Sequence, residues 1–149
     1  PAGLRREMGE VIELTSTAAG LGLDLAMSQL AFMYDEGRGV KQDEVEAVKW
    51  YRLAAAQNLA EALCALGVMY EHGRGVKKDE VEAVKWFRLA AAQNNAEALF
   101  NLGAVLANGQ GVPQDLQKAI DHLEQSQRLG HPGAPGAIAA CRGALRRGK

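Results

Sequence analysis

A 36-residue period governs this chain. Residues 36–58 and 72–94 are identical at 20 of 23 positions, and the second segment begins 36 residues after the first. A third, more diverged copy follows at the same offset, and in it Gly109, Gly111, Val112 and Ala119 align with Gly73, Gly75, Val76 and Ala83. Periods of this length are typical of repeat proteins, in which each unit buries its apolar face only by stacking on its neighbours.

The first half of each unit has the apolar spacing of a helix. Ala62, Leu66 and Tyr70 are four residues apart, which places them on one helical face. Gly67 follows Leu66, and a residue without a side chain there lets a neighbouring helix come close. Gly73 can adopt the left-handed backbone that ends a helix, so the pattern predicts a helix that stops at this glycine.

The second half of each unit begins with a helix-capping signal. Asp43 and Glu46 form a D-x-x-E pattern that Asp79 and Glu82 repeat, which predicts an aspartate N-cap. Asn94 is a candidate left-handed stop at the end of this helix. With no strand pattern in the chain, the sequence predicts an all-α fold with helices near residues 5–19, 24–36, 43–57, 60–72, 79–93, 96–108, 115–129 and 133–146.

The repeat also divides the chain. We expect one domain over residues 1–149, made of a partial repeat (1–23), two closely matched repeats (24–59 and 60–95), a diverged repeat (96–131) and a second partial repeat (132–149). The first segment corresponds to a second helix without its first, and the last to a first helix without its second. Uncovered apolar residues such as Val11 and Leu14 then predict neighbouring repeats or self-association.

The recurring pattern A-x-x-x-L-G-x-x-Y, G-x-G-V, D-x-x-x-A-x-x-W-[YF]-x-x-A-A-x-Q-N resembles the Sel1-like repeat, a relative of the tetratricopeptide repeat. The fit is best from Ala26 to Asn94 and weaker from Ala96 to Gly130, where His122 replaces Trp50 and Trp86. The resemblance implies a right-handed α/α solenoid with a concave face of first helices. Members of this family commonly act as adaptors that assemble protein complexes, so we expect a protein or peptide partner.

Charge and composition argue against other partner classes. The formal net charge is -1, from 17 basic and 18 acidic residues, whereas nucleic-acid binding needs a basic surface. No apolar run of transmembrane length occurs, so no membrane insertion is expected. The absence of paired cysteines and of a visible signal segment favours an intracellular location.

No catalytic or cofactor motif occurs in the sequence, so we expect neither an enzyme nor a bound cofactor. The two Gly-Arg-Gly turns lack the preceding strand and third glycine of a phosphate loop. The spacing of His72, His122 and His131 does not indicate a metal site. Some secreted, cysteine-rich relatives of the family are described as β-lactam-binding or β-lactamase proteins, but they carry a cysteine pair within each repeat. Cys64 and Cys141 do not form such pairs.

By analogy with tetratricopeptide repeats, first-helix residues two and six positions before the aligned tyrosine face a partner. This registration predicts a binding face of Ser28, Phe32, Cys64, Val68, Phe100 and Ala104, with Glu61 and Glu97 at its edge. Phe32 and Phe100 would be the apolar anchors, with Glu61 and Glu97 as charges at the rim. The alternative is that the two phenylalanines pack between adjacent first helices. A structural spacer within a larger protein remains another alternative for the whole chain.

Overall fold

The computed structural model describes residues 2–148, and it describes side chains from Gly9 to Gly148. Within residues 2–148 there are eight helices and no strand. The predicted helices are confirmed, with ends that differ by at most three residues from those expected. The chain divides into two compact units, which are residues 1–78 and residues 79–149.

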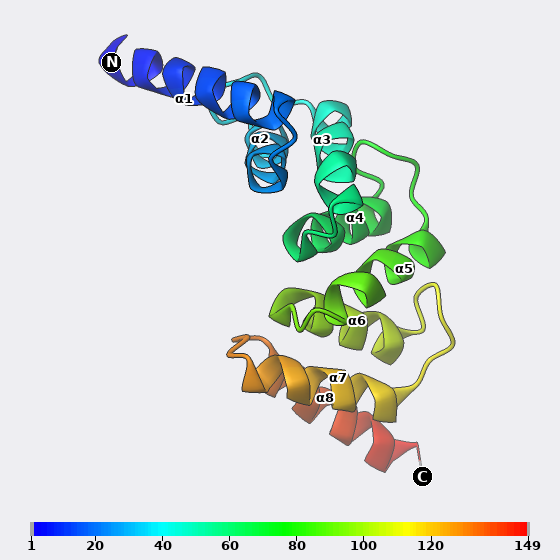
Figure 1. The fold of residues 1–149 in the computed structure, drawn as a ribbon. Helices are drawn as coiled ribbons and strands as arrows, with labels where there is room; N and C mark the ends of the chain where they lie inside the picture. The colour runs from blue at the N-terminus through cyan, green and yellow to red at the C-terminus, as the bar shows by residue number, and fades with distance from the viewer. Residues whose placement is uncertain (1, 149) are drawn as a thin grey trace. The chain divides into compact units, whose positions relative to one another are not determined.

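The first unit contains α1 (Ala2–Gly20), α2 (Asp24–Glu36), α3 (Glu44–Ala56) and α4 (Ala60–His72). Consecutive helices pack on one another along the chain, α1 on α2, α2 on α3 and α3 on α4 (Figure 1). Leu30 and Ala31 of α2 and Ala47 and Ala54 of α3 are fully buried at these contacts. Small side chains at most of these positions allow the helices to approach closely.

The second unit contains α5 (Glu80–Ala91), α6 (Ala96–Asn108), α7 (Leu116–Arg128) and α8 (Ala134–Arg147). Here α5 packs on α6, α6 on α7 and α7 on α8 (Figure 1). Gly103 of α6 lies against α7, where an added Cβ would be 2.7 Å from Leu123 Cγ. A side chain at this position would push the two helices apart, which is the role that the sequence assigns to glycine here.

The predicted helix ends are confirmed in atomic detail. The side chains of Asp43, Asp79 and Asp115 each accept a hydrogen bond of 3.0 Å from the backbone N–H three residues on. Each satisfies one of the donors that the first turn of a helix leaves free. At the C-terminal ends of the first helices, Gly37, Gly73 and Gly109 have φ angles of 69°, 67° and 67°. Asn94 has a φ of 59°, as expected for a left-handed stop.

The turns after α4 and α6 are held tightly against the second helix of the preceding repeat. Gly75 has a φ of 70°, and a Cβ added to it would lie 2.3 Å from the carbonyl oxygen of Glu44. This is far inside van der Waals contact, so only glycine fits between the turn and the first turn of α3. The second glycine of this turn is therefore a packing requirement of the repeat, whereas the sequence predicted only a turn here.

Candidate partner-binding site

A groove of about 710 Å³ lies in the first unit, open on one side. Its walls come mainly from α1 and α2, with contributions from the turn after α2 and from α3 and α4. The apolar and small polar residues of the two walls are Val11, Ile12, Thr15, Ser28, Phe32 and Met33. Three of the predicted binding residues, Ser28, Phe32 and Glu61, line this groove.

Phe32 is the most prominent apolar group of the groove. It lies in α2 with 44% of its surface exposed, although it is a large aromatic residue. The guanidinium carbon of Arg38 lies 5.4 Å from the centre of its ring, within the range of a cation–π contact. The groove therefore offers an aromatic face and a cation side by side.

Tyr51 contributes a buried phenol to the groove, from α3. Burial raises the pKa of its hydroxyl well above its ordinary value, and the nearby carboxylate of Asp35 raises it further. Tyr51 is therefore a neutral group throughout the physiological range, and it can donate a hydrogen bond but does not supply a negative charge.

An ion pair lies next to the groove, between Asp35 at the end of α2 and Arg74 in the turn after α4. Arg74 Nε is also 3.7 Å from Glu44 Oε2 at the start of α3. Burial raises the pKa of Asp35 despite the opposing effect of the Arg74 guanidinium. The side-chain amide of Gln42 donates a 2.7 Å hydrogen bond to the backbone carbonyl of Asp35, which fixes the end of α2.

Two further predicted binding residues lie in α4. Cys64 is buried, with 5% of its surface exposed, and Val68 is half-buried. Glu61, one turn before Cys64, is exposed. Of these three, only Glu61 presents its functional group fully to solvent.

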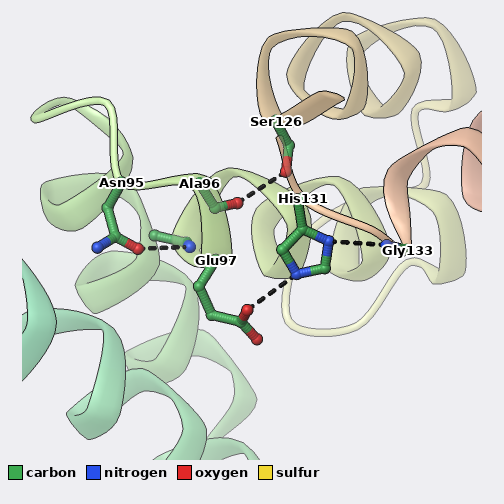
Figure 2. A network of polar contacts seen from close by, with 7 residues as sticks. Asn95, Ala96, Glu97, Ser126, His131 and Gly133 are labelled. Carbon is green, nitrogen blue, oxygen red and sulfur yellow. Dashed lines mark hydrogen bonds and ion pairs between the residues drawn. The ribbon is translucent and has the colours of Figure 1, made fainter. Parts of the chain in front are cut away.

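In the second unit, Glu97 and Phe100 of α6 contact His131, which precedes α8 (Figure 2). His131 Nε2 is 2.8 Å from Glu97 Oε2, and its ring stacks on that of Phe100 with centroids 4.2 Å apart. The N–H of Gly133 donates to His131 Nδ1 at 3.1 Å, so in the neutral ring Nε2 carries the proton and donates to Glu97. Ala104, one turn further along α6 from Phe100, is half-buried.

Hydrogen bonds beside this cluster hold the N-terminal end of α6 in place against the C-terminal end of α7. Ser126 Oγ donates a 2.8 Å hydrogen bond to the carbonyl oxygen of Ala96, and Asn95 Oδ1 accepts one of 2.9 Å from Ala98 N–H (Figure 2). A Cβ added to Gly133 would lie 3.1 Å from the Phe100 ring. Glu97 and Phe100 thus have partners inside the chain, whereas Phe32 borders an open groove.

His122 occupies the register of Trp50 and Trp86, as the sequence indicates. Its side chain is half-buried in α7 and lines a second hollow of about 810 Å³ in the second unit. Burial lowers the pKa of its imidazole, and the charges of Arg88 and Lys118 act in the same direction. The ring is therefore neutral in the folded chain near pH 7.

The sequence interpretation missed two kinds of groove residue. Arg38 was assigned only to the turn, although its recurrence as Arg74 was a signal that the side chain has a partner. Val11 entered only through the periodicity of the partial repeat, and Thr15 was not singled out at all. Nothing in the sequence indicated a role for His131, because the repeat does not keep a histidine at this position: Asn95 and Leu59 stand one and two periods earlier.

Neither a metal centre nor a membrane-spanning helix is found in the described part of the chain. Among those residues no group of three or more histidine, cysteine or acidic side chains could hold a metal ion. None of the described helices combines the length and the apolar character needed to cross a membrane.

Comparison with known proteins shows what the chain is similar to. The Sel1 repeat family matches residues 24–59, 60–95 and 96–131, while no curated protein sequence gives a match. A Sel1 repeat protein from Oxalobacter formigenes is 38% identical, with a TM-score of 0.76 over 85% of this chain and 58% of that one. The protein c5321, a protective antigen of uropathogenic Escherichia coli strains with an SLR fold, is 36% identical, with a TM-score of 0.83 over 85% of this chain and 27% of that one.

A third solved structure, the cysteine-rich protein B of Helicobacter pylori, shares the fold at 23% identity, with a TM-score of 0.69 over 89% of this chain and 95% of that one. This chain spans less than two thirds of the length of the first two structures. Together the matches confirm the predicted fold class, an all-α solenoid of Sel1-like repeats, and Sel1 repeats are known as protein-interaction scaffolds. The chain belongs to the Sel1 repeat family.

Proposed function

We propose that this chain is a non-catalytic scaffold that binds a protein or peptide through the face of its first helices. The proposed face comprises Ser28, Phe32, Glu61, Cys64, Val68, Glu97, Phe100 and Ala104. The observation that carries the proposal is Phe32, a large aromatic side chain that is 44% exposed at the wall of an open groove. Aromatic anchors in such surroundings are enriched among the residues that dominate binding energies.

The two units support the proposal to different degrees. In the first unit the groove has an apolar wall, a cation at Arg38 and a carboxylate at Glu61, which suits an amphipathic segment. In the second unit a partner would have to displace His131 before it could contact Glu97 and Phe100. We therefore propose Phe32 as the principal anchor, and Glu97 and Phe100 as secondary contacts.

The test is capture of proteins from the native lysate on the immobilised chain and on a Phe32→Ala variant. The matched control is Leu53→Ala in α3, because Leu53 has a similar exposure of 42% and does not line the groove. We expect a protein that the chain and the Leu53→Ala variant retain and the Phe32→Ala variant loses. Equal retention by all three would contradict the proposal. Circular dichroism of each variant checks that the fold is intact.

The non-catalytic part of the proposal has its own test. Cys64 and Cys141 are both buried and form no disulfide within the described residues, and burial raises the pKa of Cys141. Neither is exposed as a nucleophilic cysteine needs to be. We expect a chromogenic β-lactam to be hydrolysed no faster with the chain than in buffer. Turnover that scales with protein concentration would contradict a purely binding role.

A further inference from the structure

The second hollow, which is lined by residues of α5, α6 and α7, lies where the diverged repeat has lost aromatic side chains. One period before Leu106 stands Tyr70, and one period before His122 stands Trp86. Leu106 and His122 are both smaller than the residues that they replace, and both line the hollow. The hollow therefore contains two positions that carry larger aromatic side chains one period earlier.

In the first unit, the chain shows how a tyrosine at this register is held. Arg52 Nη2 donates a 2.7 Å hydrogen bond to the hydroxyl oxygen of Tyr70. The guanidinium carbon of Arg52 also lies 6.0 Å from the centre of the Tyr70 ring. A charged donor thus binds the phenol at its oxygen, and the same charge lies over its ring. This pair is a template within the chain for the recognition of a phenol.

The arginine of this pair is kept one period later, although the tyrosine is not. Arg88 stands at the register of Arg52 and lines the hollow. Among residues 9–148 its side chain has neither a hydrogen-bond partner nor an ion-pair partner. Burial lowers the pKa of the His122 imidazole and the charge of Arg88 lowers it further, so the guanidinium lies near that ring. A charged donor without a partner in the described chain therefore borders the space beside Leu106.

The floor of the hollow is apolar. It is formed by Leu99, Leu102 and Leu106 of α6, all of them buried. An aromatic ring placed on this floor would lose apolar surface to water and gain contacts with the leucines. The volume of about 810 Å³ lies in the range of roughly 300–1,000 Å³ that is typical of small-ligand sites. The hollow therefore has both the room and the surface for a ring.

The charges around this floor balance one another. The cations Arg88 and Lys118 line the hollow together with the carboxylates of Asp115 and Asp121. The carboxylate of Asp115 caps α7, and that of Asp121 accepts a hydrogen bond from Gln117. A carboxylate on a ligand would lie beside two like charges, whereas a neutral ligand meets no such repulsion. The balance favours a neutral group that can accept a hydrogen bond from a cation.

We propose that this hollow is a binding site for a neutral phenol, the group that a tyrosine side chain carries. Its ring packs on Leu102 and Leu106, and its hydroxyl oxygen accepts a hydrogen bond from Arg88. The ligand occupies the register of the tyrosine that the diverged repeat lacks. None of the residues that line the hollow belongs to the proposed binding face, so this site does not rest on the proposed function.

The test is a titration of the isotope-labelled chain with N-acetyl-tyrosine amide, followed by heteronuclear NMR. We expect saturable shifts of the backbone amides around the hollow, among them those of Leu106 and His122. The matched ligand is N-acetyl-phenylalanine amide, which lacks only the hydroxyl group. It should bind at least about fivefold more weakly, because it leaves Arg88 without an acceptor.

A third ligand, p-cresol, separates the two sources of a phenol. It carries the ring and the hydroxyl of tyrosine without a peptide backbone. Tighter binding of the tyrosine amide than of p-cresol would assign the site to a tyrosine of a partner peptide. Tighter binding of p-cresol would assign it to a free phenol. Absence of saturable binding for both ligands would overturn the proposal.

The variant Arg88→Met separates the hydrogen bond from the packing, since methionine keeps an apolar stem but has no donor. In this variant the tyrosine amide should bind no more tightly than the phenylalanine amide. The matched control is Lys85→Met in the same helix, which removes a cation that pairs with Glu82 and does not line the hollow. This control should keep the preference for the tyrosine amide.

A variant that fills the hollow from within gives a readout that needs no ligand. In Leu106→Tyr the chain supplies its own phenol to Arg88. The melting temperature should rise by about 2 °C or more, because the new ring gains a hydrogen bond like that between Arg52 and Tyr70. The rise should shrink when Arg88→Met is added. The filled variant should also no longer bind the tyrosine amide.

Three results would overturn the proposal. The first is equal affinity of the original chain for the tyrosine and phenylalanine amides. The second is a set of shifts confined to residues outside the hollow. The third is a folded Leu106→Tyr variant that still binds the tyrosine amide with the affinity of the original chain.

Discussion

Gly103 shows at the scale of one residue how the repeat depends on close helix contact. A Cβ there would lie 2.7 Å and 2.9 Å from two carbon atoms of Leu123, a fully buried residue. We expect Gly103→Ala to lower the free energy of unfolding by about 1–3 kcal/mol, because the side chain overfills a packed contact. Urea denaturation measures this change.

The matched control is Gly136→Ala in α8, where an added Cβ meets nothing within 4 Å. That variant should be neutral or more stable by up to about 1 kcal/mol, since alanine loses less entropy than glycine in a helix. A Gly103→Ala variant as stable as the original chain would show that α6 and α7 can separate without cost.

His122 makes a pH-dependent contribution that belongs to a single side chain. Burial lowers the pKa of the folded imidazole below its ordinary value of 6.5, so below that pH the unfolded chain binds more protons than the folded one. We expect the free energy of unfolding to fall as the pH drops from about 7.5 through 6.5. Replacement His122→Trp, the residue at this register in two other repeats, should remove this part of the fall.

The control for this measurement is His72→Gln, since the His72 side chain is 58% exposed. This variant should keep the pH dependence that His122→Trp loses. If His122→Trp and the original chain lose stability in parallel between pH 7.5 and 6, the imidazole of His122 is not the group responsible.

At the scale of the helix, the N-caps of the second helices are the most clearly predicted feature. The side chain of Asp115 accepts a 3.0 Å hydrogen bond from Lys118 N–H at the start of α7. Loss of this bond in Asp115→Ala should lower the free energy of unfolding by about 1 kcal/mol. The control is Asp121→Ala in the same helix, which loses only an exposed contact with Gln117 and should change stability by less than about 0.5 kcal/mol. Equal losses of stability in the two variants would mean that removal of the negative charge, and not of the N-cap hydrogen bond, destabilises α7.

The same scale shows where sequence reasoning ends. Asp43, Gly73 and Asn94 were predictable because caps and stops depend on the conformation of a few neighbouring residues. The cluster of Glu97, Phe100 and His131 was not, because it joins residues 34 positions apart in one copy only. Arg38 lies between these cases, since its repetition as Arg74 was visible but the lack of an acidic partner for it among residues 9–148 became evident only in the structure.

At the scale of the whole molecule, the 36-residue period and its helical spacing predicted an all-α repeat fold, and the resemblance of the recurring motif to the Sel1-like repeat predicted the family; the comparisons then confirmed both. It could not identify the partner, because one repeat scaffold carries many binding specificities in a few variable side chains. In this chain the second helices of the two closely matched repeats are almost identical, whereas the first helices differ. The variation is thus concentrated on the helices that we propose as the binding face.

The most direct measurement of that proposal is site-specific photo-crosslinking in the native lysate. Benzoyl-phenylalanine is incorporated at position 32 in one sample and at position 53 in another, because both side chains are similarly exposed and only the first lines the groove. We expect a discrete protein adduct from position 32 that is absent from position 53. Adducts of the same proteins in equal yield from both positions, or from position 53 alone, would contradict it.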